Sequence, residues 1–294
     1  MKTLITGCSG LVGSALIEYL FTKGHSIQCL QRSSDNPPRQ FWATSDLPET
    51  VNEGMDTVIH LAGENVASGR WSSKKKERIL QSRVQGTKEL IDYISSQNSL
   101  PQHFLCASAV GYYGNRGDAI LDEESSLGQG FLAEVCNQWE NECQRLSAMG
   151  VKVVNLRFGM VLSPKGGALH KMIPPIKARL GGTIGSGRQY ISWISIRDLV
   201  AIIHFIISNT KITGPVNVVS PIPTTNLGLT ESLGKALNRP TPFKVPKIMA
   251  KFIFGQMADE MLLSSTRATP KRLLEAGYEF KDQSLDEVLR FCVS

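Results

Sequence analysis

Short apolar runs alternate along the chain with longer segments in which apolar residues recur at helical spacing. The short runs are rich in β-branched residues and are apolar at successive positions, which is typical of strands buried on both faces of a parallel sheet. Such runs followed by amphipathic segments predict β-α-β units with right-handed crossovers. The expected strands are residues 2–6, 26–30, 56–63, 103–108, 151–158 and 215–219, and the expected helices are residues 11–24, 77–97, 131–148 and 197–208.

The pattern changes after residue 162, because residues 163–189 are rich in glycine and proline and follow no strand pattern. We therefore expect an α/β, doubly wound parallel sheet of the Rossmann type with a second, loop-rich lobe. Residues 1–162 would form the main domain, to which residues 190–220 return. Residues 163–189, together with the mostly helical residues 221–294, would form the smaller C-terminal lobe that holds a substrate.

The composition is that of a soluble globular protein: 294 residues, 41% hydrophobic and 20% charged. The longest strongly apolar segment, residues 199–207, is about half the length of a membrane span. The net charge of +6 is scattered apart from "SSKKKER" at 72–78, which we interpret as the solvated start of a helix. We therefore expect neither a nucleic acid nor a membrane as a partner.

The cysteines and histidines indicate no disulfide framework and no metal site. None of the six cysteines forms a Cys-x-x-Cys pair, and the five histidines show no zinc-binding spacing. Cys136 and Cys143 would lie about 10 Å apart along one helix, too far for a disulfide. A reduced, cytoplasmic compartment fits this pattern best.

Residues 6–13 read "TGCSGLVG" and stand between an expected strand and an expected helix. In that context one glycine permits a sharp turn, a second lets the backbone approach a pyrophosphate, and the third allows the helix to pack on its strand. The amides at the helix start favour phosphate. The alternative is a plain strand-to-helix turn. The predicted coenzyme contacts of this loop are Gly7, Ser9, Gly10, Leu11, Val12 and Gly13.

The end of the second expected strand indicates which dinucleotide binds. An Asp or Glu there would bind the adenosine ribose of NAD(H), but this chain has Gln31 and Arg32. Arg32 could pair with a 2′-phosphate, so NADP(H) is favoured. Asp35 stands a few residues too late unless the loop bends back. Alternatively, Arg32 is a solvated loop residue.

Longer motifs carry a family resemblance over nearly the whole chain: "LAGENVASGRW", "SRVQGT", "ASAVGYYG", "GSGRQYISWI" and "PKRLLEAGYEF". The chain resembles the extended short-chain dehydrogenase/reductase family, which includes nucleotide-sugar epimerases and dehydratases. It is most similar to the atypical, NADP-binding, 39U-like epimerase branch. The resemblance implies that Leu61, Ala62 and Gly63 lie along the adenosine and ribose. It also places Arg83 where the family has an Asn that faces the coenzyme, although a helix-surface charge is the alternative.

The resemblance places Ser108 at the position of the family's catalytic Ser, which orients the substrate and would also lie at the coenzyme; the alternative is a turn-capping Ser. The family's Tyr-x-x-x-Lys pair is missing. Phe131 or Leu132 stands in the Tyr position, and Val135 or Cys136 stands in the Lys position. None of these side chains transfers a proton at neutral pH.

Tyr112 and Tyr113 follow Ser108, and either could replace the missing phenol; the alternative is that they form an aromatic wall of the pocket. Glu134 and Glu140 would act as bases only if they turned inward, and we expect them on the helix surface.

The strand end "NLRFGMVL" places Arg157, Phe158 and Gly159 beside the expected nicotinamide, although Arg157 could instead belong to a structural ion pair. The candidate substrate contacts in the second lobe are Arg188, Gln189 and Trp193.

The sequence thus predicts an NADP(H)-dependent oxidoreductase or epimerase-like enzyme acting on a small hydroxy or carbonyl compound, with sugar derivatives included. The alternative is a catalytically silent NADPH-binding sensor, which the missing Tyr-Lys pair favours. Extended members of the family commonly form dimers through helices, so a homodimer is the expected oligomer if the chain assembles.

Overall fold

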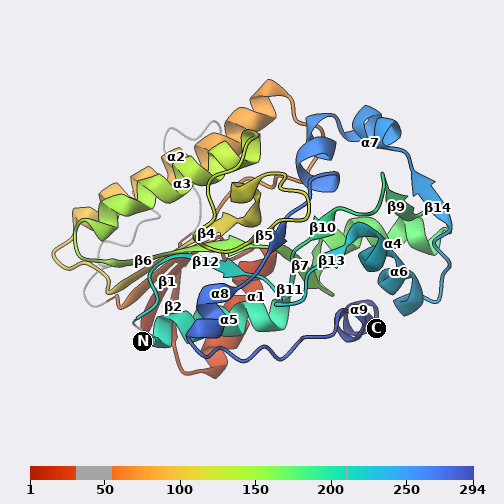
Figure 1. Cartoon of the computed structure of the whole chain (residues 1–294). Coiled ribbons are helices and arrows are strands. Elements are labelled where there is room, and N and C mark those ends of the chain that lie inside the picture. The colour runs from red at the N-terminus through yellow and green to blue at the C-terminus, as the bar shows by residue number, and fades with distance from the viewer. Residues whose placement is uncertain (31–54, 210) are drawn as a thin grey trace.

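The computed structural model describes residues 1–30, 55–209 and 211–294. A six-stranded, fully parallel sheet forms the centre of the described fold. The strand order reverses between β1 and β3, and in open α/β sheets ligands bind outside the carboxyl ends of strands at such a point. The expected Rossmann-type fold is confirmed. Across the sheet (Figure 1) the strands are β2 (Ser26–Leu30), β1 (Lys2–Thr6), β3 (Thr57–His60), β4 (His103–Ala109), β6 (Lys152–Phe158) and β12 (Gly214–Val218).

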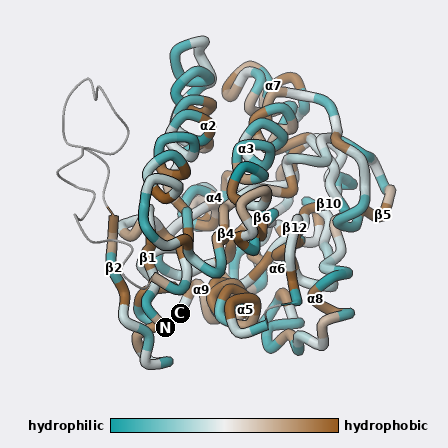
Figure 2. The backbone as a smooth tube through the Cα atoms, turned by 90° about the vertical axis from the view of Figure 1, so that its left-hand side faces the viewer, coloured by the Kyte–Doolittle hydropathy of each residue, from teal (hydrophilic) through white to brown (hydrophobic). Residues whose placement is uncertain are grey.

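Helices cover both faces of this sheet. Neighbouring residues of β1 point to opposite sides, so Leu4 belongs to one apolar core and Ile5 to the other. In Figure 2 α5 is mostly brown, because most of its residues are apolar and are buried against the sheet and α1. On one face lie α1 (Leu11–Thr22) and α5 (Ile196–Ser208), and on the other lie α2 (Ser73–Ser95) and α3 (Phe131–Ser147).

The second lobe consists of short strands and helices around its own apolar core, which contains Leu169, Trp193, Leu229 and Leu289. A small three-stranded sheet beside this core joins β8 (Gly166–Gly167), β7 (Met160–Ser163) and β11 (Trp193–Ser195). Outside the central sheet, short strands also pair β9 (Gly182–Ile184) with β14 (Phe243–Val245), β10 (Tyr190–Ile191) with β13 (Thr224–Thr225), and β5 (Ile120–Leu121) with β15 (Arg267–Ala268). The remaining described helical elements of the chain are η1 (Val110–Tyr113), α4 (Ala168–Lys177), α6 (Asn226–Ala236), α7 (Lys247–Phe254), η2 (Ala258–Leu262), α8 (Lys271–Glu275) and α9 (Leu285–Val293).

Two local expectations were wrong. The segment 163–189 contains the helix α4 despite Pro174 and Pro175, because its apolar face packs into the core of the second lobe. The basic run does start a helix, because α2 begins at Ser73, but Lys75 within the run is buried rather than solvated. The carboxylate of Glu64 lies 2.6 Å from Lys75 Nζ and compensates the buried charge.

No helix in the described ranges combines the length and apolar character needed to cross a membrane. Within the same part of the chain, no group of three or more His, Cys, Asp or Glu side chains is arranged as a metal site.

Candidate functional site

The glycine loop between β1 and α1 leaves no room for side chains at two of its glycines. Gly7 has a φ of +75°, and a Cβ there would lie 2.8 Å from the carbonyl carbon of Leu61. A Cβ on Gly13 would lie 2.2 Å from the Gly7 carbonyl oxygen. Gly10 begins α1 without a side-chain cap, and the first turn carries no acidic residue. The amides there can therefore receive an anionic group, as a dinucleotide pyrophosphate requires.

A buried polar chain holds the ends of β1 and β3 together beneath this loop. Thr6 Oγ1 accepts hydrogen bonds from the amides of Leu61 (3.2 Å) and Ala62 (3.3 Å). Because its hydroxyl proton remains free, Thr6 donates it to His60 Nδ1, 2.7 Å away. Burial lowers the pKa of His60 to about 3, so the ring is neutral and reaches Thr87 Oγ1 through Nε2. This chain fixes the backbone that faces Gly7.

Arg83 lies where β3 ends. A Cβ on Gly63 would lie 3.2 Å from the centre of the Arg83 guanidinium, so the two residues are in direct contact. Arg83 Nη1 donates to the carbonyl oxygens of Glu64 (3.1 Å) and Ile79 (3.2 Å). Burial lowers the pKa of Arg83 from its usual high value. The expected Arg83–coenzyme contact stays a prediction, but the side chain does lie at the strand end where that contact would form.

Three neighbouring strands present polar residues in register at the carboxyl end of the sheet. Ser108 on β4 pairs with Arg157 on β6, and Arg157 pairs with Asn217 on β12. In-register residues of parallel strands point to the same face, so these side chains form one row. All three are buried.

Glu140 connects this row to α3, and the expectation that it lies on the helix surface was wrong. It is only 8% exposed. Ser108 Oγ donates to Glu140 Oε1 at 2.6 Å, and Arg157 donates to both carboxylate oxygens at 2.8 and 2.7 Å. The sequence did contain a signal: Glu140 falls within the helical stripe of Cys136, Trp139 and Cys143, all of which are buried.

The two tyrosines after Ser108 have different environments. Tyr113 is fully buried, donates to Asn217 Oδ1 at 2.7 Å and accepts from Arg157 Nη1 at 2.9 Å. Burial raises the pKa of Tyr113 to about 12, so Tyr113 is a structural member of the network and a poor proton donor. Tyr112 is half-buried, and the Arg157 guanidinium stacks on its ring at 3.5 Å.

Of the two roles expected for Arg157, the structure shows the structural ion pair. Its guanidinium nitrogens bind the Glu140 carboxylate and the Tyr113 hydroxyl.

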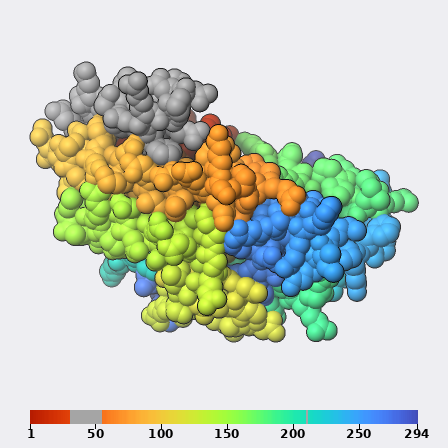
Figure 3. All heavy atoms as spheres, turned by 90° about the horizontal axis from the view of Figure 1, so that it is seen from above, coloured from red at the N-terminus to blue at the C-terminus, as the bar shows by residue number. Residues whose placement is uncertain are grey.

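The structure confirms that α3 carries no Tyr-Lys pair. Phe131 and Leu132 begin the helix, and their amides donate to the two carboxylate oxygens of Glu260 at 3.0 and 2.7 Å. Burial raises the pKa of the Cys136 thiol to about 11, so this side chain is neutral. Glu260, which comes from η2 in the second lobe, was not found by sequence reasoning. Figure 3 shows the start of α2 (orange), α3 (lime) and the region of α7 (blue) meeting on one face.

The three candidate substrate contacts also differ in whether they are buried or exposed. Trp193 is buried in the core and donates Nε1–H to the carbonyl of Ile222, so it is not available to a substrate. The Gln189 amide is also buried and donates to the carbonyls of Ile184 and Leu262. Arg188 is exposed, and its substrate contact stays a prediction. Gln31, Arg32 and Asp35 lie outside the described residues.

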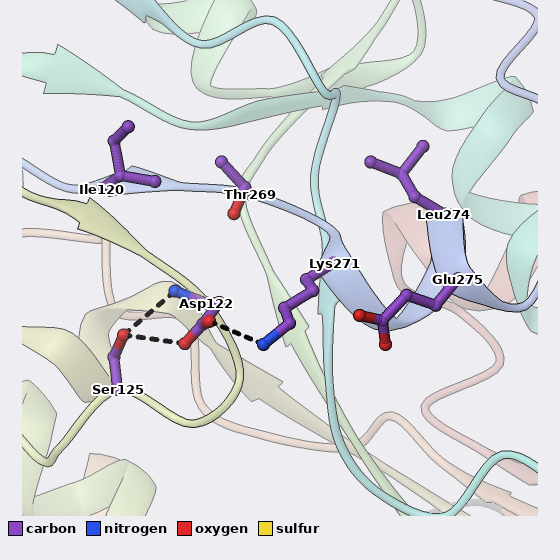
Figure 4. Close-up of a pocket in the computed structure, with 7 residues that line it drawn as sticks. All are labelled: Ile120, Asp122, Ser125, Thr269, Lys271, Leu274 and Glu275. Carbon is purple, nitrogen blue, oxygen red and sulfur yellow. Dashed lines mark hydrogen bonds and ion pairs between the residues drawn. The ribbon is translucent and has the colours of Figure 1, made fainter.

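A surface hollow of about 440 Å³ lies elsewhere in the molecule. Lys271 in its wall pairs with Asp122 at 3.3 Å and with Glu124 at 3.1 Å. None of the lining residues belongs to the glycine loop or to the Ser108–Glu140–Arg157 contacts, so we assign it no role in the candidate site. They are Ile120, Asp122, Ser125, Thr269, Lys271, Leu274 and Glu275 (Figure 4).

Comparisons with known proteins agree with this geometry. The model of the NAD dependent epimerase/dehydratase family matches residues 3–219, and a domain of unknown function, DUF1731, matches residues 245–292. An epimerase family protein of Mycobacterium bovis is 38% identical over 293 residues, which are 99% of this chain and 97% of that protein. Epimerase family protein YfhF of Bacillus subtilis is 33% identical over 296 residues, covering 98% of this chain and 97% of that protein.

Solved structures extend the comparison to the fold. The human epimerase family protein SDR39U1 (isoform 2), solved with NADPH, is 30% identical and superposes with a TM-score of 0.90 over 99% of both chains. UDP-glucose 4-epimerase of Thermus thermophilus, solved with NAD, superposes with a TM-score of 0.75 over 100% of this chain and 98% of the epimerase chain. Because it is only 16% identical, this likeness shows the fold alone. The matched family model and the similar full-length relatives show that this chain belongs to the NAD-dependent epimerase/dehydratase family, whose members bind nicotinamide dinucleotides and act on small molecules.

Proposed function

We propose that this protein is an NADP(H)-dependent oxidoreductase or epimerase-like enzyme that acts on a small hydroxy or carbonyl compound, sugar derivatives included. The glycine loop carries this proposal, because Gly7 and Gly13 exclude side chains and the start of α1 offers uncapped amides. The bound coenzyme would supply or accept a hydride. NADP(H) is favoured by Arg32 in the sequence and by the NADPH in the human relative.

The remaining coenzyme contacts are proposals from the sequence and from position. Leu61, Ala62 and Gly63 follow β3, with Leu61 and Ala62 against Gly7 of the glycine loop, and Gly63 is in contact with the Arg83 guanidinium. We assign residues 1–162 and 190–220 to the coenzyme domain, and residues 163–189 and 221–294 to the substrate lobe. The cytoplasm remains the proposed compartment, and a homodimer the proposed oligomer.

Ser108 and Tyr112 are the side chains that we propose meet the substrate oxygen. Ser108 already donates its proton to Glu140, so its oxygen can accept a hydrogen bond from a substrate hydroxyl. A proton leaving that hydroxyl could pass to Ser108 while the Ser108 proton passes to Glu140. Arg157 holds the carboxylate in place for this transfer through two hydrogen bonds. Tyr112 contributes a phenol beside the same Arg157.

The first test is a titration of the purified protein with NADPH and with NADH, followed by nicotinamide fluorescence. We expect NADPH to bind more tightly, and Arg32→Ala to lose most of that preference. Arg239→Ala, which removes an exposed Arg of the second lobe, is the matched control and should bind as the wild type does. Equal binding of both coenzymes, or none, would contradict the NADP(H) assignment.

The second test offers carbonyl compounds to the NADPH complex. Substrate-dependent oxidation of NADPH that falls in Ser108→Ala supports an enzyme. Tight binding with NADPH left intact by every carbonyl would favour the silent sensor, an alternative that gains no support from the comparisons.

A further inference from the structure

Two thiols meet beside the glycine loop. Cys8 follows Gly7 in the loop, and its Sγ donates to the Ile5 carbonyl at 3.1 Å. Cys29 lies on β2, in register with Ile5 of β1. Because Cys8 Sγ lies on the Ile5 carbonyl and Cys29 is the register partner of Ile5, the two thiols are neighbours, and their interaction contributes to the raised pKa of Cys8. The pair thus joins the loop to the end of β2, the two segments where the pyrophosphate and the adenosine end of a dinucleotide are expected.

The two thiols differ in exposure, and this sets the order in which they would react. Cys29 is exposed, whereas Cys8 is partly buried. Burial, followed by the interaction with Cys29, raises the pKa of Cys8 to about 12, so Cys8 is a poor initial target for an oxidant. The other cysteines of the chain are buried. Cys29 is therefore the thiol that a dissolved oxidant meets first.

We propose that Cys8 and Cys29 form an oxidation site at which a peroxide reversibly weakens coenzyme binding; the second half of this statement rests on the proposed function. The peroxide oxygen adds to the Cys29 sulfur, which gives a sulfenic acid and one water. The Cys8 sulfur then attacks the Cys29 sulfur, the S–S bond forms, and the sulfenic oxygen leaves with the Cys8 proton as a second water. Two thiols lose two electrons in all, and one hydrogen peroxide is reduced to two waters.

The loop that carries Cys8 is closely packed, so we expect the new bond to shift it. A disulfide brings the sulfurs to about 2 Å, well inside the separation of neighbouring thiols that share no bond. Gly7 and Gly13 already approach backbone atoms too closely to accept a Cβ. A pull on Cys8 would therefore displace the neighbouring Gly7 and, through the hydrogen bond from the Gly10 amide to the Gly7 carbonyl, the start of α1 where the pyrophosphate is expected. Hydrogen bonds from backbone amides to a phosphate weaken steeply with distance and misalignment, so a displaced loop should bind the pyrophosphate less tightly.

The test treats the full chain with hydrogen peroxide and follows two quantities. Intact mass and peptide mapping report whether a Cys8–Cys29 disulfide forms, and NADPH fluorescence reports the Kd before oxidation, after it, and after reduction with dithiothreitol. We expect the disulfide, a Kd raised about tenfold or more, and full recovery on reduction. Cys29→Ser should keep its NADPH affinity in peroxide, and Cys8→Ser should form no disulfide. Cys292→Ser, which removes a buried thiol of the second lobe, should respond as the wild type does.

Absence of the Cys8–Cys29 disulfide would overturn the proposal, and so would a disulfide that leaves the NADPH Kd unchanged. A third outcome is a protein that forms the disulfide in peroxide but fails to bind NADPH even when both thiols are reduced. That result would contradict the proposed function and would leave Cys8 and Cys29 as an oxidation site that regulates no coenzyme.

Discussion

Two clusters in this molecule each contain an ion pair between a basic and an acidic side chain, but one cluster is buried and the other is exposed. The buried network consists of Ser108, Tyr113, Glu140, Arg157 and Asn217, and its ion pair has side chains that are 3% and 10% exposed. The surface cluster consists of Asp122, Glu124 and Lys271, with the side chains of Lys271 and Glu124 41% and 71% exposed. Asp122 and Lys271 of the surface cluster line the hollow of Figure 4, and no member of the buried network is among the residues that line it.

The difference shows that a hollow is a weaker guide to this site than buried polar chemistry. Water can solvate any charge of the surface cluster that loses its ion-pair partner. Removing one of these side chains should therefore change the free energy of unfolding little. In the buried network each group relies on its neighbours, because an unpaired charge or hydroxyl there would lose its solvation without compensation. The network also lies at the carboxyl end of the sheet, where ligands of this fold bind.

The largest expected effect comes from Glu140→Gln. The substitution leaves the Arg157 charge buried without its counter-charge, so the free energy of unfolding should fall by about 3 to 5 kcal/mol. Urea unfolding measures it. The matched control is Glu134→Gln on the same helix, which is exposed and should change stability little. Equal losses in the two variants would remove the distinction between buried and exposed carboxylates.

Alkaline pH should weaken the buried network next. Burial raises the pKa of Tyr113 to about 12, above the usual value of about 10 for an unfolded tyrosine. The neutral phenol therefore contributes stability that is complete below pH 10 and is lost as pH rises toward 12, at about 1.4 kcal/mol per pH unit.

Tyr113→Phe should flatten the dependence of unfolding free energy on pH above 10 by about one proton. Tyr278, whose pKa burial also raises, keeps its own contribution in both proteins. Tyr112→Phe serves as the control, and a profile that Tyr113→Phe leaves unchanged would count against the buried phenol.

Ser108→Ala should have a smaller effect on stability, of about 1 kcal/mol, because Glu140 Oε1 keeps its hydrogen bond from Arg157. Chemical unfolding measures that loss, and NADPH titration should show coenzyme binding close to wild type. A loss as large as that of Glu140→Gln would mean that Ser108 supports the ion pair rather than the substrate.

The smallest effect is expected from Lys271→Ala in the surface cluster. Its ion pairs are exposed, so urea unfolding should not separate the variant from the wild type. The difference in unfolding free energy between the variant and the wild type should also stay close to zero when the salt concentration is raised. A clear destabilisation would show that the hollow has a structural role which its exposure does not suggest.

Much of the fold was predictable because its signals are local. The β-branched runs, the amphipathic helices and the "TGCSGLVG" loop each depend on residues close together in the sequence, and the structure forms the expected sheet around them. Trp193 shows where local signals end, because a short strand does not reveal which of its faces meets a core.

Spacing and residue type along the chain are enough to predict the Rossmann-type architecture and the glycine loop and to show that the Tyr-Lys pair is missing. Which distant residues share a buried site depends instead on how the elements pack. Glu140 meets Ser108 and Arg157 because α3 lies across β4 and β6, and Glu260 meets the start of α3 because η2 folds back from the second lobe. No local pattern encodes these pairings, because they arise only when strands and helices pack and each buried charge must find a partner.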